Sequence, residues 1–474
     1  MSDPRFDPER WAARRRAFDT LEARMVRMRL QDADEDVAPI ADALRYVLSF
    51  ARLTSVRNRD GEEVDVSGIN HLFALQVEEA ATRALDGAED LWEVGRALPE
   101  LVEATRRARA AVLQRLAIDR DALEAEVTTR LLAVVSGGGG GAGYVYPGAF
   151  ETLERHGLIP DLMVGTSIGA LMSMFRSRRR RYDPAPMVAA ARSLTWSSVF
   201  RVFEAENRYG LPATLRLYLR AALGELFQRP DGDPVCLSDM EIPLYVVATG
   251  ITVDALKHDL DYYEHLLQPE VQRGSLRSGV RGVIKTIAIL REFLARRDAL
   301  EEVVLGRTPG TEDFDVLDAA GFSAAIPGVI HYDVVRPDAR MHRLLDHLYA
   351  THGITRLGEG GMVANVPARV AWETCVGGLL GRRNCFVLAL DCFAPGASSL
   401  AWYPLQQLVR SSNVDLHRAY ADLYVDFPRT LSPMNLVPPL RDVFLAMRWG
   451  RSRLEPHMPF IREMMKPLPV LPDA

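Results

Sequence analysis

The chain has 474 residues, of which 48% are hydrophobic and 25% are charged, and its formal net charge is -6. This composition is that of a globular protein long enough for two or three domains, and its acidic balance gives no general attraction to nucleic acid. The four cysteines form no CxxC pair and have no histidine cluster at metal-ligand spacing, which argues against a disulfide framework and a zinc site. We therefore expect neither a nucleic-acid partner nor a bound metal.

Residues 1–130 are predicted to form a helical region. Apolar residues recur at helical spacing in Trp11–Met28, Ala38–Leu53 and Leu91–Leu116. The charged N-terminus lacks the apolar core of a signal peptide, and no stretch of about 18 apolar residues occurs. These features predict a cytoplasmic protein, with peripheral contact at a membrane left open.

A catalytic domain is predicted over residues 131–395. Its first strand is the apolar run Leu131–Val135, and further buried strands are expected at Asp161–Val164, Pro243–Thr249 and Cys385–Asp391. Because helical or polar segments separate these strands, the pattern predicts an α/β sheet covered by helices.

Two additions to this domain are expected from the patterning of the remaining sequence. A helical insertion is predicted at about 254–304, and residues 396–474 are rich in proline and are expected to pack on the core as short pieces. The role of residues 1–130 is not indicated by any motif.

The segment Gly165-Thr166-Ser167-Ile168-Gly169 has the GxSxG pattern of a nucleophile elbow. It follows a predicted strand and precedes a helical pattern, and Gly165 and Gly169 would allow the sharp turn that exposes the serine oxygen. By chance the pattern occurs in about one chain in ten of this length, so its context has to decide.

A glycine-rich loop, Ser136–Gly143, follows the first predicted strand. Its backbone amides can approach an anion closely and are suited to an oxyanion hole. A nucleotide phosphate loop is the alternative, but no Lys-Ser or Lys-Thr follows the glycines as that motif requires. The oxyanion hole is the preferred interpretation.

Glu359 lies in Gly358-Glu359-Gly360-Gly361, well downstream of the serine. A carboxylate in a poorly solvated pocket can accept the proton of a serine, although a solvated loop carboxylate is the simpler interpretation. An α/β-hydrolase triad would instead need a histidine such as His417 or His457, and neither of these lies in a motif that would position it.

These motifs together resemble the patatin-like phospholipase family. The resemblance runs from Ser136 to Ala170 and continues in Ser323–Val329 and in the acidic residue before two glycines. It implies a parallel-sheet α/β core with helices on both faces, hydrolysis of lipid acyl esters by a Ser–carboxylate dyad, and no metal or organic cofactor. Carried over by position, the nucleophile is Ser167, the dyad acid is Glu359, and the oxyanion amides are those of Gly138, Gly139, Gly140 and Gly141.

Two positions depart from the family pattern. The dyad residue of the family is aspartate, so Glu359 carries its carboxylate on a side chain one methylene longer, and Ala142 stands where members commonly have Arg or Lys. A misplacement of about 1 Å can cost ~100-fold in rate. The main expectation is a lipase or phospholipase A-type hydrolase; the alternatives are a degenerate member that binds lipid or protein without turnover, and an acyltransferase.

Two segments have both a membrane interpretation and a simpler one. Arg176–Arg181 could attract anionic lipid headgroups, but charge runs are more often solvated loops. Val443–Trp449 could lie on a membrane surface, but packing against the core is the commoner role of such residues. Membrane contact is therefore a secondary expectation.

Overall fold

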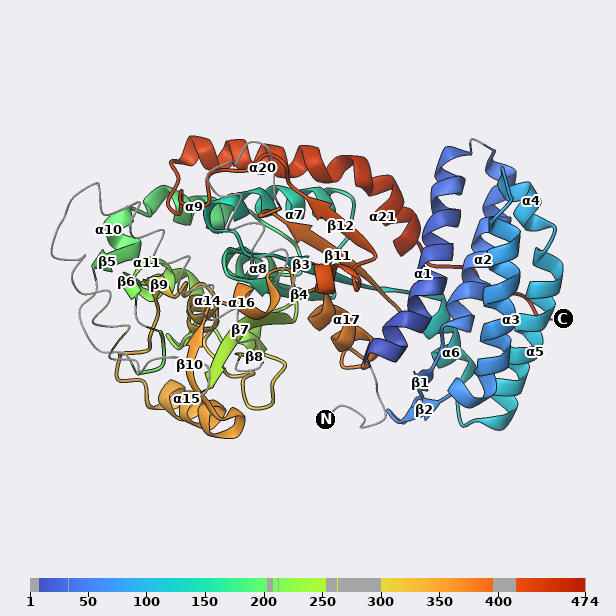
Figure 1. The fold of residues 1–474 in the computed structure, drawn as a ribbon, viewed down its shortest axis with the longest axis horizontal. Helices are drawn as coiled ribbons and strands as arrows, with labels where there is room; N and C mark the ends of the chain where they lie inside the picture. Colours follow the sequence, from blue (N-terminus) through green and yellow to red (C-terminus); the bar gives the residue numbers. More distant parts are fainter. Residues whose placement is uncertain are drawn as a thin grey trace. The chain divides into compact units, whose positions relative to one another are not determined.

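The fold is a computed structural model that describes residues 8–32, 34–202, 208–211, 213–252, 262, 300–394 and 415–473. The chain divides into two compact units (Figure 1). The first comprises Met1–Leu132, Trp372–Phe386 and Pro456–Ala474, and the second comprises Ala133–Ala371 and Val387–Glu455. The end of the C-terminal extension thus belongs to the same unit as the N-terminal helices.

The first unit is mainly helical. Its helices are α1 (Pro8–Gln31), α2 (Ala38–Ala51), α3 (Ser67–Leu85), α4 (Leu91–Gly95), α5 (Leu98–Arg115), α6 (Arg120–Thr128) and α21 (Met458–Met465), and two short strands, β1 (Ser55–Arg57) and β2 (Glu63–Asp65), pair antiparallel. The helices cover the segments in which apolar residues recur at helical spacing, because that spacing gives each helix an apolar stripe to bury.

A charged cluster lies inside this first unit. Glu22 is fully buried, and its carboxylate contacts Arg45 Nε at 3.0 Å, Arg52 Nη1 at 2.9 Å and the guanidinium of Arg130. Burial alone would raise the pKa of Glu22, but the three guanidiniums together hold it well below its usual range. Removing one partner of such a buried cluster is expected to destabilise the unit strongly.

The second unit is organised by a seven-stranded sheet. Its strands are β3 (Leu131–Ser136), β4 (Leu162–Thr166), β7 (Leu244–Thr252), β8 (Leu300–Leu305), β10 (Ile354–Gly358), β11 (Cys385–Asp391) and β12 (Leu423–Asp426). Strands that are hydrogen-bonded to one another follow one another in the series β10-β7-β4-β3-β11-β12, and β8 also pairs with β7. The four strands that the sequence predicted are therefore present, and three more strands join them.

The sheet is mixed, so the prediction of a parallel sheet holds for part of it and does not extend to β8 and β10. β4 runs parallel to β3 and to β7, and β12 runs parallel to β11, whereas β8 and β10 are antiparallel to β7. The nine-residue β7 extends past the five-residue β4, so part of its backbone needs other hydrogen-bond partners. The apolar pattern of a buried strand does not encode the direction of its neighbours.

The register of β7 decides how the ends of two strands meet. Residues 244–247 pair with β4, residues 249–252 pair with β10, and residues 246–251 pair with β8. The residues of β7 that pair with β8 overlap those that pair with β4 and those that pair with β10. Because a strand has only two edges, β8 occupies one edge of β7, and β4 and β10 share the other edge. They run toward each other along it, and their carboxyl ends meet beside Ala248.

Helices surround this sheet within the second unit. They are α7 (Tyr146–Arg155), α8 (Ile168–Ser177), α9 (Ala185–Ser193), α10 (Trp196–Val199), α11 (Leu219–Leu223), α14 (Val316–Ser323), α15 (Ala339–His352), α16 (Gly361–Ala364), α19 (Asp415–Arg418) and α20 (Leu440–Leu454). Helix α17 (Ala368–Val376) begins in this unit and ends in the first. A smaller sheet has the order β5-β6-β9, with bounds Phe200–Val202, Ala213–Leu217 and Gly328–His331. Helix α8 packs on β4, and α14 packs on β7 and α8.

The C-terminal extension contributes more regular structure than its prolines suggested. It supplies the edge strand β12 and the helix α20, which packs along α7 (Figure 1). A Cβ on Gly148 of α7 would lie 1.9 Å from the carbonyl oxygen of Met447, so this close helix contact requires glycine. Val443 and Met447 are buried, which agrees with core packing of this segment.

The predicted helical insertion at 254–304 lies outside the described residues except for Tyr262 and its last five positions. Those last positions belong to β8, which begins at Leu300, so the end of the segment is a strand. Among the residues that the structure describes, no helix combines the length and the apolar character needed to cross a bilayer.

Candidate active site

Ser167 lies between β4 and α8 in a strained turn. Its φ of 55° and ψ of -125° make it the one non-glycine residue with positive φ in the described part of the chain. Such backbone strain persists only where the surrounding structure enforces it, and it is typical of functional sites. A Cβ on Gly169 would lie 2.0 Å from Ser136 O, so the turn needs glycine at that position.

Glu359 follows β10 directly and reaches the same place from the opposite direction. Its amide donates to Ala325 O at 3.0 Å, and its carbonyl accepts from the Thr249 hydroxyl at 2.7 Å. Because β4 and β10 converge on one edge of β7, the residues after each strand are brought together. The structure therefore places Glu359 beside Ser167, although 191 residues of sequence separate them.

The two side chains lie close together, since a Cβ on Gly138 would lie 3.2 Å from Ser167 Cβ and 3.5 Å from a Glu359 carboxylate oxygen. Burial raises the pKa of Glu359 to about 7, and hydrogen bonds from Ser167 and from the Gly361 amide limit the rise. Glu359 is therefore not a solvated loop carboxylate. Its pKa is in the range that suits a general base at neutral pH.

The pair has no histidine. Within the described residues, neither Ser167 nor Glu359 has a histidine among its hydrogen-bond partners. His417 is buried, and burial together with nearby Arg369 lowers its pKa to about 4. In the described part of the chain, a serine and a carboxylate thus lie together with no histidine bonded to either.

Ser323 forms hydrogen bonds with Ser167 and with the residue after Glu359, and the sequence did not reveal these contacts. Its hydroxyl accepts from the Ser167 amide at 2.8 Å and donates to Val247 O at 2.5 Å, and its carbonyl accepts from the Gly360 amide at 3.2 Å. The signal was present, because Ser323 begins the motif Ser323–Val329. What the motif could not show is that its hydroxyl supports the strained turn.

The glycine loop lies next to Ser167, and its amides divide into two groups. Gly138 N–H donates to Asn365 O at 3.0 Å, and Gly141 N–H donates to Pro433 O at 2.9 Å. Among the described residues, no acceptor pairs with the amides of Gly139 and Gly140. Of the four predicted oxyanion donors, these two are therefore available to a ligand.

An apolar cavity of about 100 Å³ opens beside Ser167 and Gly140. Its wall is made almost wholly of aliphatic, methionine and phenylalanine side chains, including Leu171, Phe175, Met187, Leu217, Ile330 and Leu436. A pocket of this kind favours a hydrocarbon chain by the hydrophobic effect. The arrangement can hold an acyl group with its carbonyl at the serine.

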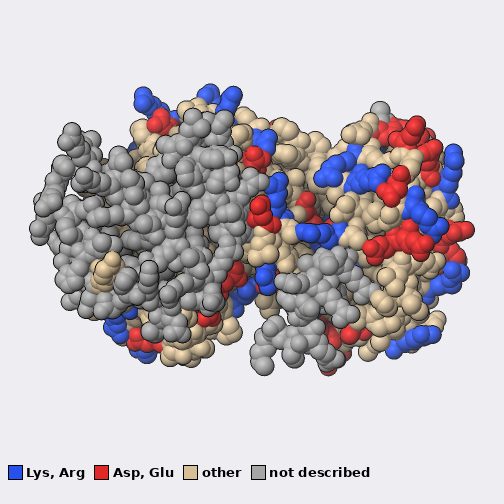
Figure 2. Space-filling model, in the orientation of Figure 1, with Lys and Arg blue, Asp and Glu red and all other residues tan. Residues whose placement is uncertain are grey.

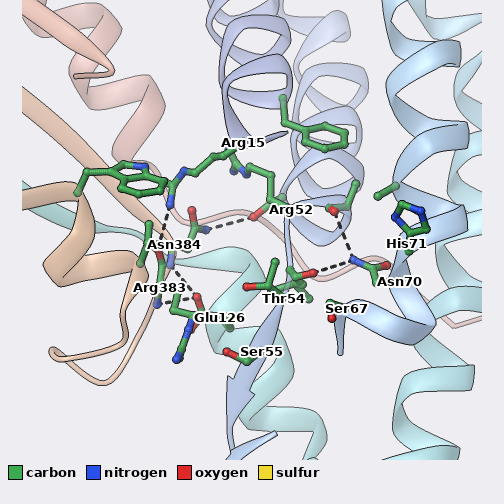
Figure 3. Close-up of a pocket in the computed structure, with 17 residues that line it drawn as sticks. Arg15, Arg52, Thr54, Ser55, Ser67, Asn70, His71, Glu126, Arg383 and Asn384 are labelled. Atoms are coloured by element: carbon green, nitrogen blue, oxygen red, sulfur yellow. Dashed lines mark hydrogen bonds between the residues drawn. The ribbon is translucent and has the colours of Figure 1, made fainter. Parts of the chain in front are cut away.

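A second cavity, of about 50 Å³, lies in the first unit (Figure 3). Charged side chains line it, but they pair with carboxylates: Arg15 and Arg52 with Asp19, and Arg383 with Glu63. None of the predicted site residues lines it. Within the described residues, no group of three or more His, Cys, Asp or Glu side chains could hold a metal ion.

The basic run Arg176–Arg181 is partly built into the fold. Arg176 is fully buried and donates to the carbonyl oxygens of Arg179 and Arg180, and Arg179 pairs with Glu241 at 2.5 Å. On the face drawn in Figure 2, acidic and basic side chains are interspersed over the described surface. On the described part of that face, neither sign of charge predominates.

The fold and the site define an α/β protein with a serine at a nucleophile elbow, a half-buried carboxylate beside it and a glycine-rich loop. The sequence profile of the patatin-like phospholipase family matches residues 134–372, which is half of the chain, so the chain belongs to this family. This family is one of lipid acyl hydrolases. No curated protein matches the chain.

Proposed function

We propose that the protein is a serine hydrolase of lipid acyl esters that works through the pair Ser167–Glu359. The observation that carries the proposal is the close approach of the serine at a strained elbow and a half-buried carboxylate whose pKa is raised to about 7. The glutamate reaches the serine despite its extra methylene. This contact favours an enzyme over a degenerate binding protein.

The chemistry follows from the positions of these groups. Ser167 Oγ attacks the acyl carbonyl while the Glu359 carboxylate accepts the hydroxyl proton. The amides of Gly139 and Gly140 stabilise the oxyanion of the tetrahedral intermediate. Collapse expels the alcohol, which takes the proton from Glu359, and leaves an acyl-enzyme. A water molecule, deprotonated by the same carboxylate, then releases the fatty acid and regenerates Ser167.

The size of the cavity suggests which acyl chains are cleaved. An apolar cavity of about 150 Å³ accepts benzene, so about 100 Å³ beside Ser167 suits a short acyl chain. The substrate is therefore proposed to be an ester in which the cleaved acyl chain is short.

The test is a series of p-nitrophenyl esters and diacyl glycerophospholipids of increasing chain length. Glu359→Gln should lower kcat by about 10²- to 10⁴-fold, and Ser167→Ala should lower it by at least about 10³-fold. Ser452→Ala, at an exposed position of α20, is the matched control and should leave the rate unchanged. Absence of turnover by the unmodified protein would favour the binding-protein alternative, and ester formation with an added alcohol would identify an acyltransferase.

A further inference from the structure

A turn of the C-terminal extension, Ser432–Val437, lies directly against the glycine loop, and we call it the closing turn. The Gly141 amide donates to Pro433 O at 2.9 Å, and the Tyr144 hydroxyl donates to Leu436 O at 3.2 Å. A Cβ on Gly140 would lie 2.3 Å from Pro433 O. The two backbones are therefore in direct contact at Gly141 and at Gly140, which carries one of the two available amides.

The closing turn is itself held in place. Within it, the Asn435 amide donates to Ser432 O at 2.9 Å, and the Leu436 amide donates to Met434 O at 2.9 Å. It connects β12 of the main sheet to α20, which packs on α7 and on the segment Gly140–Val145. A turn fixed at both ends can hold a loop in one conformation, which the oxyanion geometry requires.

The same turn forms part of the wall of the apolar cavity. Leu436 and Val437 line it together with Ser167 and Gly140. Leu436 Cδ2 lies 3.3 Å from the position that a Cβ on Gly140 would occupy. The side chains of the turn thus face the space beside the nucleophile, while its carbonyl groups hold the loop. The turn lies outside residues 134–372, which the family profile matches.

We infer that the closing turn determines substrate specificity: Leu436 and Val437 limit the length of the acyl chain, and the carbonyls of Pro433 and Leu436 position the oxyanion loop. This inference rests on the proposed ester hydrolysis. Burying one methylene favours binding by roughly fourfold. Each methylene that the cavity gains or loses is therefore expected to change relative kcat/KM by about that factor.

The experiment compares kcat/KM for p-nitrophenyl acetate, butyrate, octanoate and laurate in the full chain. Leu436→Ala should move the preferred ester toward longer chains. Val437→Phe should move the preferred ester toward shorter chains. A loss of folding in the variants cannot explain shifts of the chain-length preference in opposite directions. Leu416→Ala, an exposed leucine of the same unit, is the matched control and should leave the profile unchanged.

Tyr144→Phe tests the positioning role separately, because it removes only the hydroxyl that donates to Leu436 O. We expect kcat to fall by up to about tenfold, the effect of one lost hydrogen bond, with KM for short esters unchanged.

If the unmodified protein has no esterase activity, both the proposed function and this inference are refuted. An active protein whose Leu436 and Val437 variants keep the same chain-length profile would overturn the inference alone.

Discussion

The raised pKa of Glu359 predicts that this residue lowers the stability of the fold at neutral and alkaline pH. The ordinary value is 4.5, and the folded protein raises the pKa to about 7. Between these values the folded state binds more protons than the unfolded state, so stability falls as pH rises through this range. At pH 8 the cost is about 3 kcal/mol, because each unit is worth about 1.4 kcal/mol.

Glu359→Gln removes this cost because the carboxamide cannot ionise. We expect the variant to be more stable than the unmodified protein by up to about 3 kcal/mol at pH 8, and by only about 1 kcal/mol at pH 5. Urea unfolding at both pH values, followed by circular dichroism, measures the difference. Glu35→Gln, whose side chain is 89% exposed, is the control. A Glu359→Gln difference that stays the same at both pH values would refute a raised pKa.

Three further predictions concern activity. Because Glu359 must be ionised to accept a proton, kcat/KM should rise about tenfold per pH unit below pH 7 and level off above it; a flat profile from pH 5 to 8 would contradict this role. Glu359→Asp should lower kcat about 100-fold, although aspartate is the residue of the family, because the backbone here is placed for the longer side chain; equal activity would show that the pair tolerates either length. Ser323→Ala removes the acceptor for the Ser167 amide and should cost about 1–3 kcal/mol of stability together with a lower kcat, as thermal unfolding and ester hydrolysis would show; unchanged values would remove Ser323 from the site.

The local features of the site could be predicted because they depend on short stretches of sequence. A buried strand followed by GxSxG specifies the turn at Ser167, and the strand has the bounds Leu162–Thr166 where Asp161–Val164 was expected. The glycine loop, which was predicted to form the oxyanion hole, lies next to the serine. Its two occupied amides could not be predicted, since Asn365 O and Pro433 O come from distant segments.

The features that depend on strand pairing were not available from the sequence. The antiparallel direction of β10 is what brings Glu359 to the end of β4, and apolar patterning is the same for either direction. The contact between the closing turn and the glycine loop could not be predicted either, because the prolines of this segment indicate only irregular structure. Sequence could therefore name the two candidate residues, while the sheet register explains why they lie together.

The central claim, that Ser167 is a nucleophile activated by Glu359, is tested most directly by covalent labelling with a fluorophosphonate probe. Peptide mass spectrometry of the labelled full chain identifies the modified residue. We predict one adduct on Ser167 in the unmodified protein, none in Ser167→Ala, and labelling slowed by at least about 100-fold in Glu359→Gln. A folded protein that does not label, or that labels equally fast in Glu359→Gln, would contradict the assignment of the pair.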